Sequence, residues 1–238
     1  MRYNILLMSG KGERFKNEGF LTPKALLPIG KETMFEQAMK NFPACDKWFF
    51  TVTPEINENK IFLDFLDQFE ENYEIILIEK TTNGQATSAF YVTQNLEPNS
   101  EIFIGSCDAI IEEKLDFNDF SECEFSTITT IPTNLQLENP TKYGWVVKSE
   151  KKYHILCKQK LEENQKPEGV LLGFFYFKES SIFNFGYNFI ETNNLFVNDE
   201  LYIDTLTQVL NNKQFIFLNK LVTASVLGTP SEYEIYNK

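Results

Sequence analysis

Two glycines and two basic residues near the N-terminus have the types and spacing of an anion-binding loop. An apolar run over residues 3–8 ends at Gly10-Lys11-Gly12, and Arg14 and Lys24 follow before the next helix-like segment. Glycine lets the backbone approach a ligand closely, and successive N–H groups in such a turn form a cradle for phosphate. Arginine adds a planar fork of donors, and lysine adds a mobile positive charge. The stretch therefore predicts a phosphate site directly after the first strand.

This glycine pair fits neither of two well-known phosphate motifs. Phe15 stands where a dinucleotide-binding fingerprint needs its third glycine, and no stretch matches a P-loop, which is GxxxxGK followed by Ser or Thr. Taken alone, the glycines are equally compatible with a tight turn after a strand. The basic residues and the rest of the chain therefore have to decide between the two interpretations.

The elements that must position this loop alternate between strand and helix. The sequence predicts strands over 3–8, 48–52, 74–78 and 101–104, and helices over 33–42, 57–69 and 85–96. This order favours a parallel, doubly wound sheet covered by helices on both faces. The last of these strands leads into Gly105-Ser106-Cys107-Asp108. An acid beyond the carboxyl end of a parallel strand is well placed to face a ligand crevice.

In the second half of the chain, the alternation of strands and helices gives way to consecutive strands. Strand-like runs over 125–132, 145–148, 153–158 and 170–177 are separated only by turns, which predicts antiparallel additions to the sheet. Helices over 180–191 and 200–210, a final strand pair over 214–218 and 222–227, and a short terminal helix complete the chain. No Pro-, Gly- or Ser-rich linker and no repeat interrupts the sequence, so we expect one mixed α/β domain over residues 1–238.

Composition limits the partners that this protein can have. With 22 Lys and Arg against 34 Asp and Glu, the net charge is −12, and no block of basic residues stands out. Phosphates of nucleic acid or of an anionic membrane would be repelled, whereas a small phosphorylated ligand remains compatible with one local basic loop. The four cysteines are widely spaced, which argues against a disulfide framework or a zinc site. No signal peptide or long apolar segment is present, and we expect a cytoplasmic protein.

The stretch Gly10-Lys11-Gly12-Glu13-Arg14-Phe15, followed by Gly19-Phe20-Leu21-Thr22-Pro23-Lys24, resembles the nucleotidyltransferase (sugar-nucleotide pyrophosphorylase) family. In that family, a GxGxR loop after the first strand and a Pro-Lys pair hold a nucleoside triphosphate. The resemblance implies a Rossmann-like, GT-A-type fold, in which residues 1–120 bind the nucleotide and residues 121–238 bind the acceptor. It gives catalytic roles to Arg14 and Lys24. The nucleotide-binding residues that it implies are Met8, Ser9, Gly10, Lys11, Gly12, Thr82, Gly84 and Gln85.

Further matches follow in the family's order. Asp108 matches the aspartate that binds Mg²⁺, Lys160 matches a lysine that holds the acceptor phosphate, and Lys158 is a competitor for that role. The acceptor-binding residues implied by the resemblance are Gly144, Gly173 and Glu200.

Two positions depart from the family's pattern. Glu13 replaces the usual Thr or Ser, and Val226, before Gly228-Thr229-Pro230, replaces an aspartate that is the second metal ligand in many members. A single carboxylate still suffices in principle, because Mg²⁺ keeps several waters and binds phosphate oxygens.

The resemblance predicts transfer of a nucleoside monophosphate from a triphosphate to a small phosphorylated acceptor, with release of pyrophosphate. The acceptor is a sugar 1-phosphate or a non-sugar phosphate, CTP is favoured as the donor, and the expected pathway is surface-polysaccharide or capsule biosynthesis. A GT-A glycosyltransferase is one alternative, although Ala109-Ile110 after Asp108 does not supply an Asp-x-Asp motif. A non-catalytic nucleotide-binding homologue is another. The oligomeric state is left open.

Overall fold

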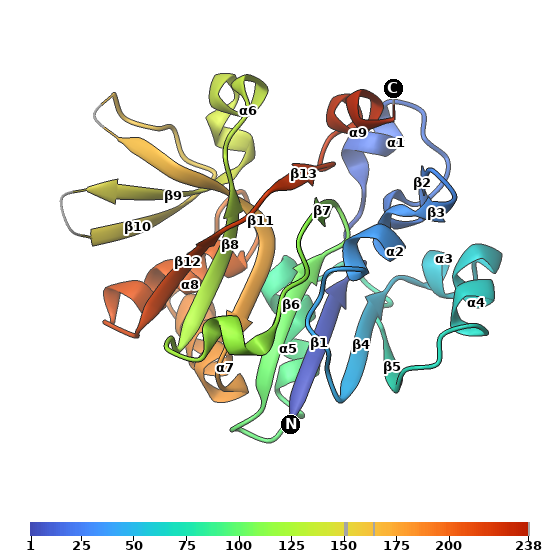
Figure 1. Ribbon diagram of the computed structural model, residues 1–238, viewed down its shortest axis with the longest axis horizontal. Coiled ribbons are helices and arrows are strands. Elements are labelled where there is room, and N and C mark those ends of the chain that lie inside the picture. The colour runs from blue at the N-terminus through green and yellow to red at the C-terminus, as the bar shows by residue number, and fades with distance from the viewer. Residues whose placement is uncertain (150–151, 164, 238) are drawn as a thin grey trace.

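The computed structural model describes residues 1–149, 152–163 and 165–237, and within them a nine-stranded mixed sheet forms the centre of the molecule (Figure 1). Four parallel strands lie in the order β5 (Tyr73–Leu77), β4 (Lys47–Val52), β1 (Arg2–Leu7) and β6 (Glu101–Ser106). The chain first proceeds from β1 to one side and then returns to β6 on the other side. The strand order thus reverses between β1 and β6, which is where doubly wound sheets bind ligands.

Antiparallel strands extend the sheet beyond β6. The long strand β11 (Lys166–Phe177) runs antiparallel to β6, and β9 (Gly144–Ser149) and β10 (Lys152–Cys157) follow it. β11 also pairs with β8 (Phe125–Thr130). The mixed sheet, parallel in its N-terminal half with antiparallel additions, confirms the predicted fold class.

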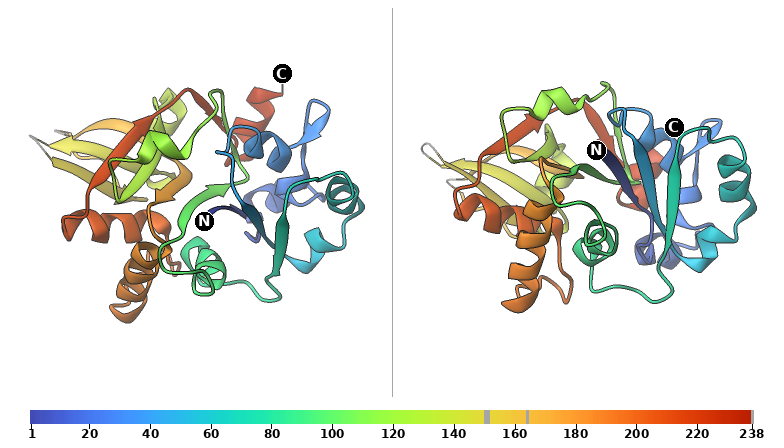
Figure 2. Two further views of the ribbon diagram at one scale, coloured as in Figure 1. Left: turned by 60° about the horizontal axis from the view of Figure 1, so that its bottom comes forward. Right: turned by 90° about the horizontal axis from the view of Figure 1, so that it is seen from below.

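Helices cover both faces of the sheet, as Figure 2 shows. Helices α5 (Gln85–Thr93), α7 (Ser180–Thr192) and α8 (Ile203–Asn212) pack on one face, and α2 (Met34–Met39) and α4 (Lys60–Leu66) pack on the other. Side chains of β1 alternate between the two layers, because successive residues of a strand point to opposite faces. Both layers are apolar, so β1, β4 and β6 read as largely hydrophobic runs.

The remaining elements are short and lie around the carboxyl edge of the parallel strands or at the periphery. They are α1 (Glu13–Asn17), β2 (Pro28–Ile29), β3 (Glu32–Thr33), α3 (Pro54–Asn57), β7 (Ala109–Ile111), α6 (Asn134–Glu138), β12 (Phe217–Leu221), β13 (Ala224–Val226), α9 (Pro230–Tyr236) and 3-10 turns at Lys24–Leu26, Phe117–Phe120 and Pro140–Lys142.

Two predictions of local structure need correction. The helix predicted over 57–69 is shorter, because the Asn59 side chain caps α4 at Lys60 and the helix ends at Leu66, and the short helix α3 before it was not predicted. The two strands predicted as a final pair do not pair with each other. β12 is parallel to β8, whereas β13 is antiparallel to β7, a strand that the sequence pattern did not indicate. This second pairing matters for function because it places β13 beside Asp108.

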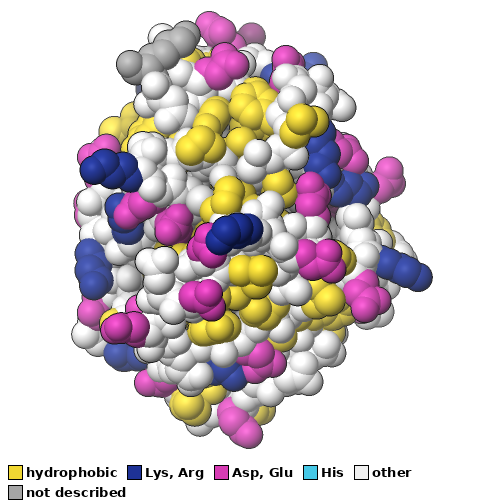
Figure 3. Space-filling model, turned by 90° about the vertical axis from the view of Figure 1, so that its right-hand side faces the viewer, with side chains coloured by type: hydrophobic (Ala, Val, Ile, Leu, Met, Phe, Trp, Pro, Cys, Tyr) yellow, Lys and Arg dark blue, Asp and Glu magenta, His cyan; other side chains and the backbone are white. Residues whose placement is uncertain are grey.

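The surface is mixed in charge. Figure 3 shows one face of the molecule, on which Lys and Arg side chains are interspersed with Asp and Glu. Among the described residues, no helix has both the length and the apolar character needed to span a bilayer.

Candidate nucleotide-binding cleft

A cavity of about 780 Å³ opens at the carboxyl ends of β1 and β6, at the point where the strand order reverses. Its walls come from the loop after β1, the residues after β6, the start of α5 and the segment before α8. Twelve of the residues expected from the sequence line this one cavity. They are Met8, Ser9, Gly10, Lys11, Gly12, Arg14, Lys24, Thr82, Gly84, Gln85, Asp108 and Glu200.

The loop after β1 uses its two glycines differently. Gly12 adopts the left-handed conformation (φ 64°, ψ 23°) and caps α1, so the turn itself requires a glycine. At Gly10 φ is not positive, and a Cβ atom there would meet nothing within 4 Å. The fold itself therefore does not require a glycine at position 10. Lys11 pairs with Glu13 at 3.5 Å, and the Glu13 side chain is 69% exposed.

Lys24 and Asp108 meet in the cleft. Lys24 starts the turn after Pro23, and its Nζ donates to Asp108 Oδ2. The two side chains are only 18% and 26% exposed. Burial alone would raise the pKa of Asp108, but the positive charge and hydrogen bond of Lys24 outweigh it and hold that pKa below its ordinary value.

The surroundings of Asp108 offer few further carboxylates to a metal ion. Val226 pairs with Ala109 in the β13–β7 ladder, so a valine lies where a second acid would flank Asp108. Glu232 is nearby but accepts hydrogen bonds from Thr229 Oγ1 at 2.8 Å and Tyr143 Oη at 3.0 Å. Within the described ranges, no three His, Cys, Asp or Glu residues cluster as a metal site. A Mg²⁺ ion here would have to take its other ligands from phosphate and water.

The loop before α5 is hydrogen-bonded to the segment before α8, and both segments line the cleft. Gly84 has φ 118°, and a Cβ atom there would lie within 2.5–3.0 Å of the Leu201 backbone. Asn83 O accepts a hydrogen bond from Leu201 N at 2.5 Å, and Ala86 N donates to Leu201 O at 3.1 Å. Only glycine permits this contact, because its φ is rare for other residues and no side chain fits. The loop 82–86 and the segment 198–202 are therefore held together.

Hydroxyl groups line the wall beside this junction. Ser88 Oγ lies 2.8 Å from Thr82 Oγ1 and 3.2 Å from Ser9 Oγ, and Ser9 Oγ lies 3.4 Å from Thr51 Oγ1. These groups join β1, β4 and α5 across the base of the cavity. A hydroxyl both donates and accepts, so this wall can hydrogen-bond a polar ring edge.

Lys158 adds a positive charge on the wall formed by the second half of the chain. It follows β10 in a left-handed conformation (φ 50°), and its Nζ donates to Tyr202 Oη, which in turn donates to Glu200. Burial lowers the pKa of Lys158, and the positive charge of Arg14 acts in the same direction. Glu200 opposes this shift.

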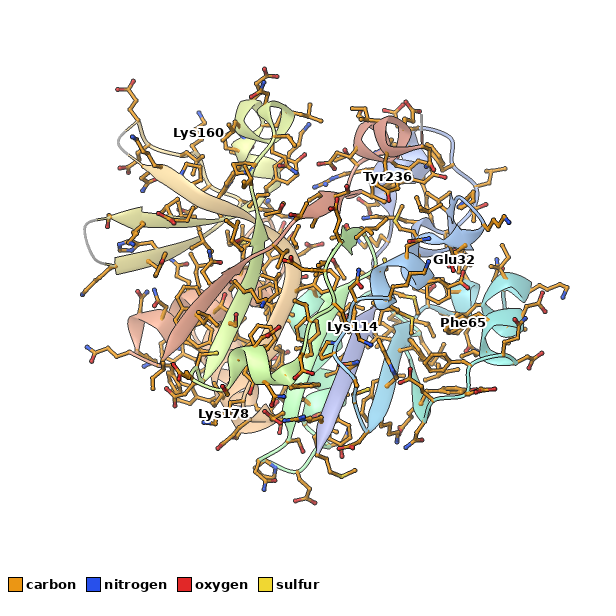
Figure 4. All side chains as sticks on the ribbon, viewed as in Figure 1. Glu32, Phe65, Lys114, Lys160, Lys178 and Tyr236 are labelled. Carbon is orange, nitrogen blue, oxygen red and sulfur yellow. The ribbon has the colours of Figure 1, made fainter. Side chains whose placement is uncertain are left out.

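Three residues expected at the site do not line the cavity. Lys160 is exposed and belongs to the segment between β10 and β11, as Figure 4 shows. Gly144 lies behind the wall, where the space of a Cβ atom is taken by Asp204 and Leu171. Gly173 (φ 75°) lies behind Ser106, whose hydroxyl donates to the Leu172 carbonyl at 3.1 Å.

Sequence reasoning missed Ser88, Tyr202 and Asp204. Tyr202 and Asp204 lie within or directly after the matched segment 198–203, so their polarity beside Glu200 was an available signal. Ser88 gave no signal, because a serine within a helix is usually unremarkable.

The chain matches no protein-family profile and no curated protein in sequence. It does match solved structures of nucleotidyltransferases. A nucleoside-diphosphate-sugar pyrophosphorylase from Vibrio cholerae RC9 aligns with a TM-score of 0.75 and 17% identity over 98% of both chains. A candidate glucose-1-phosphate thymidylyltransferase from Bacillus anthracis, in complex with a sucrose, aligns with a TM-score of 0.76 and 17% identity, over 100% of this chain and 94% of that one.

The inositol-1-phosphate CTP transferase from T. maritima aligns with a TM-score of 0.71 and 16% identity, over 99% of this chain and 94% of that one. The chain therefore has the nucleotidyltransferase fold over its whole length. This confirms, at the level of the fold, the resemblance that the sequence motifs indicated.

Proposed function

We propose that this protein is a nucleotidyltransferase that moves a nucleoside monophosphate from a nucleoside triphosphate to a small phosphorylated acceptor and releases pyrophosphate. The observation that carries the proposal is the juxtaposition, at the strand-order reversal, of the Gly10 loop with the Lys24–Asp108 pair. Parallel α/β sheets bind ligands in this crevice, and here it combines open backbone with positive charge. Residues 1–120 supply the nucleotide side and residues 121–238 the acceptor side.

On the nucleotide side, Gly10 supports the proposal most specifically. Neither its φ nor its surroundings require glycine, so the absence of a side chain is best explained by a ligand that approaches the backbone. Arg14, exposed at the cleft, would neutralise the leaving pyrophosphate, and Lys24 the α-phosphate. The hydroxyls of Thr82 and Ser88 would face the base.

On the acceptor side, we assign the phosphate-holding role to Lys158 instead of Lys160. Lys158 lines the cavity and Lys160 does not. An acceptor phosphate oxygen would attack the α-phosphorus in line, forming a new P–O bond while the bond to the β-phosphate bridging oxygen breaks. Pyrophosphate leaves with those electrons. Such chemistry needs positioning and charge neutralisation and no covalent intermediate on the protein.

Asp108 would hold Mg²⁺, and the positive charge of the ion would neutralise part of the negative charge of the triphosphate. In this structure Asp108 pairs with Lys24, so a cation bound to Asp108 would have to displace the Lys24 ammonium, which would then be free to contact a phosphate. The lack of a second acid at Val226 makes the triphosphate an obligatory part of such a site.

We propose CTP as the first donor to test, because the T. maritima neighbour is a CTP transferase and the acceptor-side motif departs from that of sugar nucleotidyltransferases. The loop with Arg14-Phe15 resembles a subgroup common in surface-polysaccharide gene sets, so capsule or surface-polysaccharide biosynthesis is the pathway we propose. We place the reaction in the cytoplasm, where nucleoside triphosphates are supplied.

The experiment measures melting temperature with Mg²⁺ plus CTP, UTP, dTTP, GTP or ATP, and then pyrophosphate release with the nucleotide that binds. We expect one triphosphate to raise the melting temperature and to support release when phosphorylated acceptors are present. A melting shift without turnover would favour the non-catalytic homologue. Sugar transfer from a finished nucleotide sugar, without pyrophosphate, would favour a glycosyltransferase. No shift with any triphosphate would refute the proposal.

A further inference from the structure

β5 is an edge strand of the central sheet, and among the described residues no strand pairs with its outer edge (Figure 1). On its inner edge, the carbonyl of Asn72 and the N–H of Ile78 each form a hydrogen bond of 2.8 Å to β4. The backbone groups of successive residues in a strand point to opposite edges, so those of Tyr73, Ile75 and Leu77 point outward. β5 thus offers three residues whose N–H and C=O groups are free to pair with another strand.

The side chains at this edge are apolar and partly exposed. Tyr73 is 37% exposed and Leu77 is 44% exposed, and Ile75 is partly buried against the layer that contains α4. In the same layer, α4 adds Ile61 and Leu63, which are 45% and 44% exposed. Figure 3 views the molecule from this side and shows hydrophobic side chains on its surface. Such a surface gains free energy when it is covered.

β5 lacks the residues that protect exposed strand edges in other proteins. An uncovered edge is a template for another strand, and it is usually blunted by lysine or proline. At the other end of the sheet, β10 contains Lys152, and the branch strand β12 contains Lys220. β5 contains neither lysine nor proline. Its one acid, Glu74, pairs with Lys47 of β4 at 2.7 Å, so the strand presents no uncompensated charge to a second copy.

The edge is complementary to itself in one antiparallel register. A two-fold axis perpendicular to the sheet at Ile75 places this residue opposite the partner's Ile75, and Tyr73 opposite the partner's Leu77. The outward-pointing residues then form three hydrogen-bonded pairs, each of which exchanges two hydrogen bonds, and apolar side chains face apolar ones. Axes one residue away place Glu74 opposite itself or Tyr73 opposite Glu79, and both are less favourable.

We infer that the chain forms a two-fold symmetric dimer in which the two β5 strands pair antiparallel across Ile75 and join the two sheets into one. An isologous interface uses the same surface of both copies, which is what a self-complementary edge provides. No residue of β5 lines the nucleotide cleft, so the inference is independent of the proposed function. The dimer leaves the residues of both clefts outside the interface strand.

Sedimentation equilibrium on the full chain, at a series of micromolar concentrations, tests the association. The wild type should reach twice the mass of 27.7 kDa. Leu77→Lys places a charge among the apolar pairs and should raise the dimer dissociation constant at least about tenfold. Leu77→Pro removes an outward N–H without removing a hydrogen bond to β4 and should weaken the dimer similarly. Leu137→Lys, at a 41% exposed leucine of α6, is the matched control and should leave the dimer intact.

Disulfide formation tests the register. In the proposed pairing, Ile75→Cys faces its own copy at a Cα–Cα distance of about 5.5 Å, which a disulfide can span. Oxidised glutathione should therefore link Ile75→Cys into a covalent dimer. Glu74→Cys is the control, because position 74 faces position 76 of the partner and should not be linked. Both variants carry Cys45→Ser, because the other three cysteines are buried.

A wild type that stays monomeric at every concentration would overturn the inference. A dimer that persists in Leu77→Lys and Leu77→Pro, or one that Leu137→Lys weakens equally, would place the interface elsewhere and also overturn it. Efficient linkage of Glu74→Cys in place of Ile75→Cys would refute the register. Circular dichroism and melting temperature establish that each variant is folded, and if Leu77→Lys does not fold, Leu77→Pro and the disulfide test decide.

Discussion

Lys24 and Asp108, 84 residues apart in the chain, form an ion pair inside the cleft, where their side chains are 18% and 26% exposed. Lys24 lies in the segment after β1 and α1, and Asp108 follows β6, so the pair links the segments that leave the two strands between which the sheet reverses its order. The pair concentrates one positive and one negative group where a triphosphate and its cation would bind. It also ties the Gly10 loop region to the sheet.

Removal of Lys24 should cost stability in a pH-dependent way. Asp108 has a folded-state pKa below its ordinary value, so its contribution is present above the unfolded pKa near 4 and is lost as the pH falls below it. Lys24→Ala should therefore lower the free energy of unfolding by about 1–3 kcal/mol at pH 7, and by less at pH 3.5. Urea unfolding at both pH values measures this. Lys60→Ala, which breaks an exposed pair with Asp64, should cost less than about 0.5 kcal/mol. An equal Lys24→Ala deficit at both pH values would contradict the account.

Gly10 and Gly84 should respond oppositely to alanine. Gly10→Ala should leave stability unchanged or raise it by up to about 1 kcal/mol, because the site has space and an ordinary φ. It should still raise the KM for the triphosphate about tenfold, because the added methyl group would face the ligand. Gly84→Ala should destabilise the fold by about 2–4 kcal/mol, because its Cβ would press on the Leu201 backbone. Unfolding curves and steady-state kinetics give both quantities. A Gly10→Ala enzyme with an unchanged KM would argue against phosphate binding at this loop.

Glu13 should be dispensable for triphosphate binding. Although Glu13 lines the cavity, its side chain is 69% exposed and pairs with Lys11, so its charge is partly neutralised and screened by solvent. Glu13→Thr frees Lys11 and should leave the KM for the triphosphate unchanged, or lower it by no more than about fivefold. Glu18→Thr, an exposed acid that does not line the cavity, is the control. A large increase in KM would reveal a positive role for Glu13.

Asp204 should destabilise the protein at neutral pH. The Asp204 residue is 7% exposed, and burial raises the pKa of its carboxyl to about 6 in spite of the nearby Lys158. Because the folded pKa lies above the unfolded one, the folded state binds the proton more tightly. The resulting stability is complete below pH 4 and is lost between pH 4 and pH 6.

Asp204→Asn should therefore raise the free energy of unfolding at pH 8 by up to about 3 kcal/mol, while changing it little at pH 4. Chemical denaturation at the two pH values tests this. A stabilisation of the same size at pH 4 and pH 8 would show that ionisation of Asp204 is not the cause.

Much of this architecture could be predicted from local patterns. The parallel strands β1, β4 and β6 are mostly buried and read as apolar runs, and the loop after β1 carries its glycines and basic residues in sequence order. The position of Asp108 follows from the rule that ligands bind beyond the carboxyl ends of such strands. The strands, the loop after β1 and the position of Asp108 each depend on a few residues that are close together in the chain, so a local sequence pattern is enough to predict them.

Other features depend on contacts that sequence does not reveal. β7 and β13 are three-residue strands without a periodic pattern, and their pairing brings together segments more than 100 residues apart. Lys158 and Lys160 are the same residue type two positions apart, and only the folded backbone, which is left-handed at Lys158, shows which one lines the cavity. The bridge through Tyr202 likewise requires β10 and the start of α8 to be placed first.

The most direct test of the central claim is the rate of pyrophosphate release with Mg²⁺, the triphosphate that binds and a phosphorylated acceptor. Lys24→Ala and Asp108→Asn should each lower this rate about 10²–10³-fold, because each removes charge from the reacting phosphates or their cation. Lys60→Ala and Asp64→Asn are the matched controls on the solvent-facing side of α4 and should retain the wild-type rate. If Lys24→Ala and Asp108→Asn release pyrophosphate as fast as the wild type, the assignment of this cleft as the catalytic site is wrong.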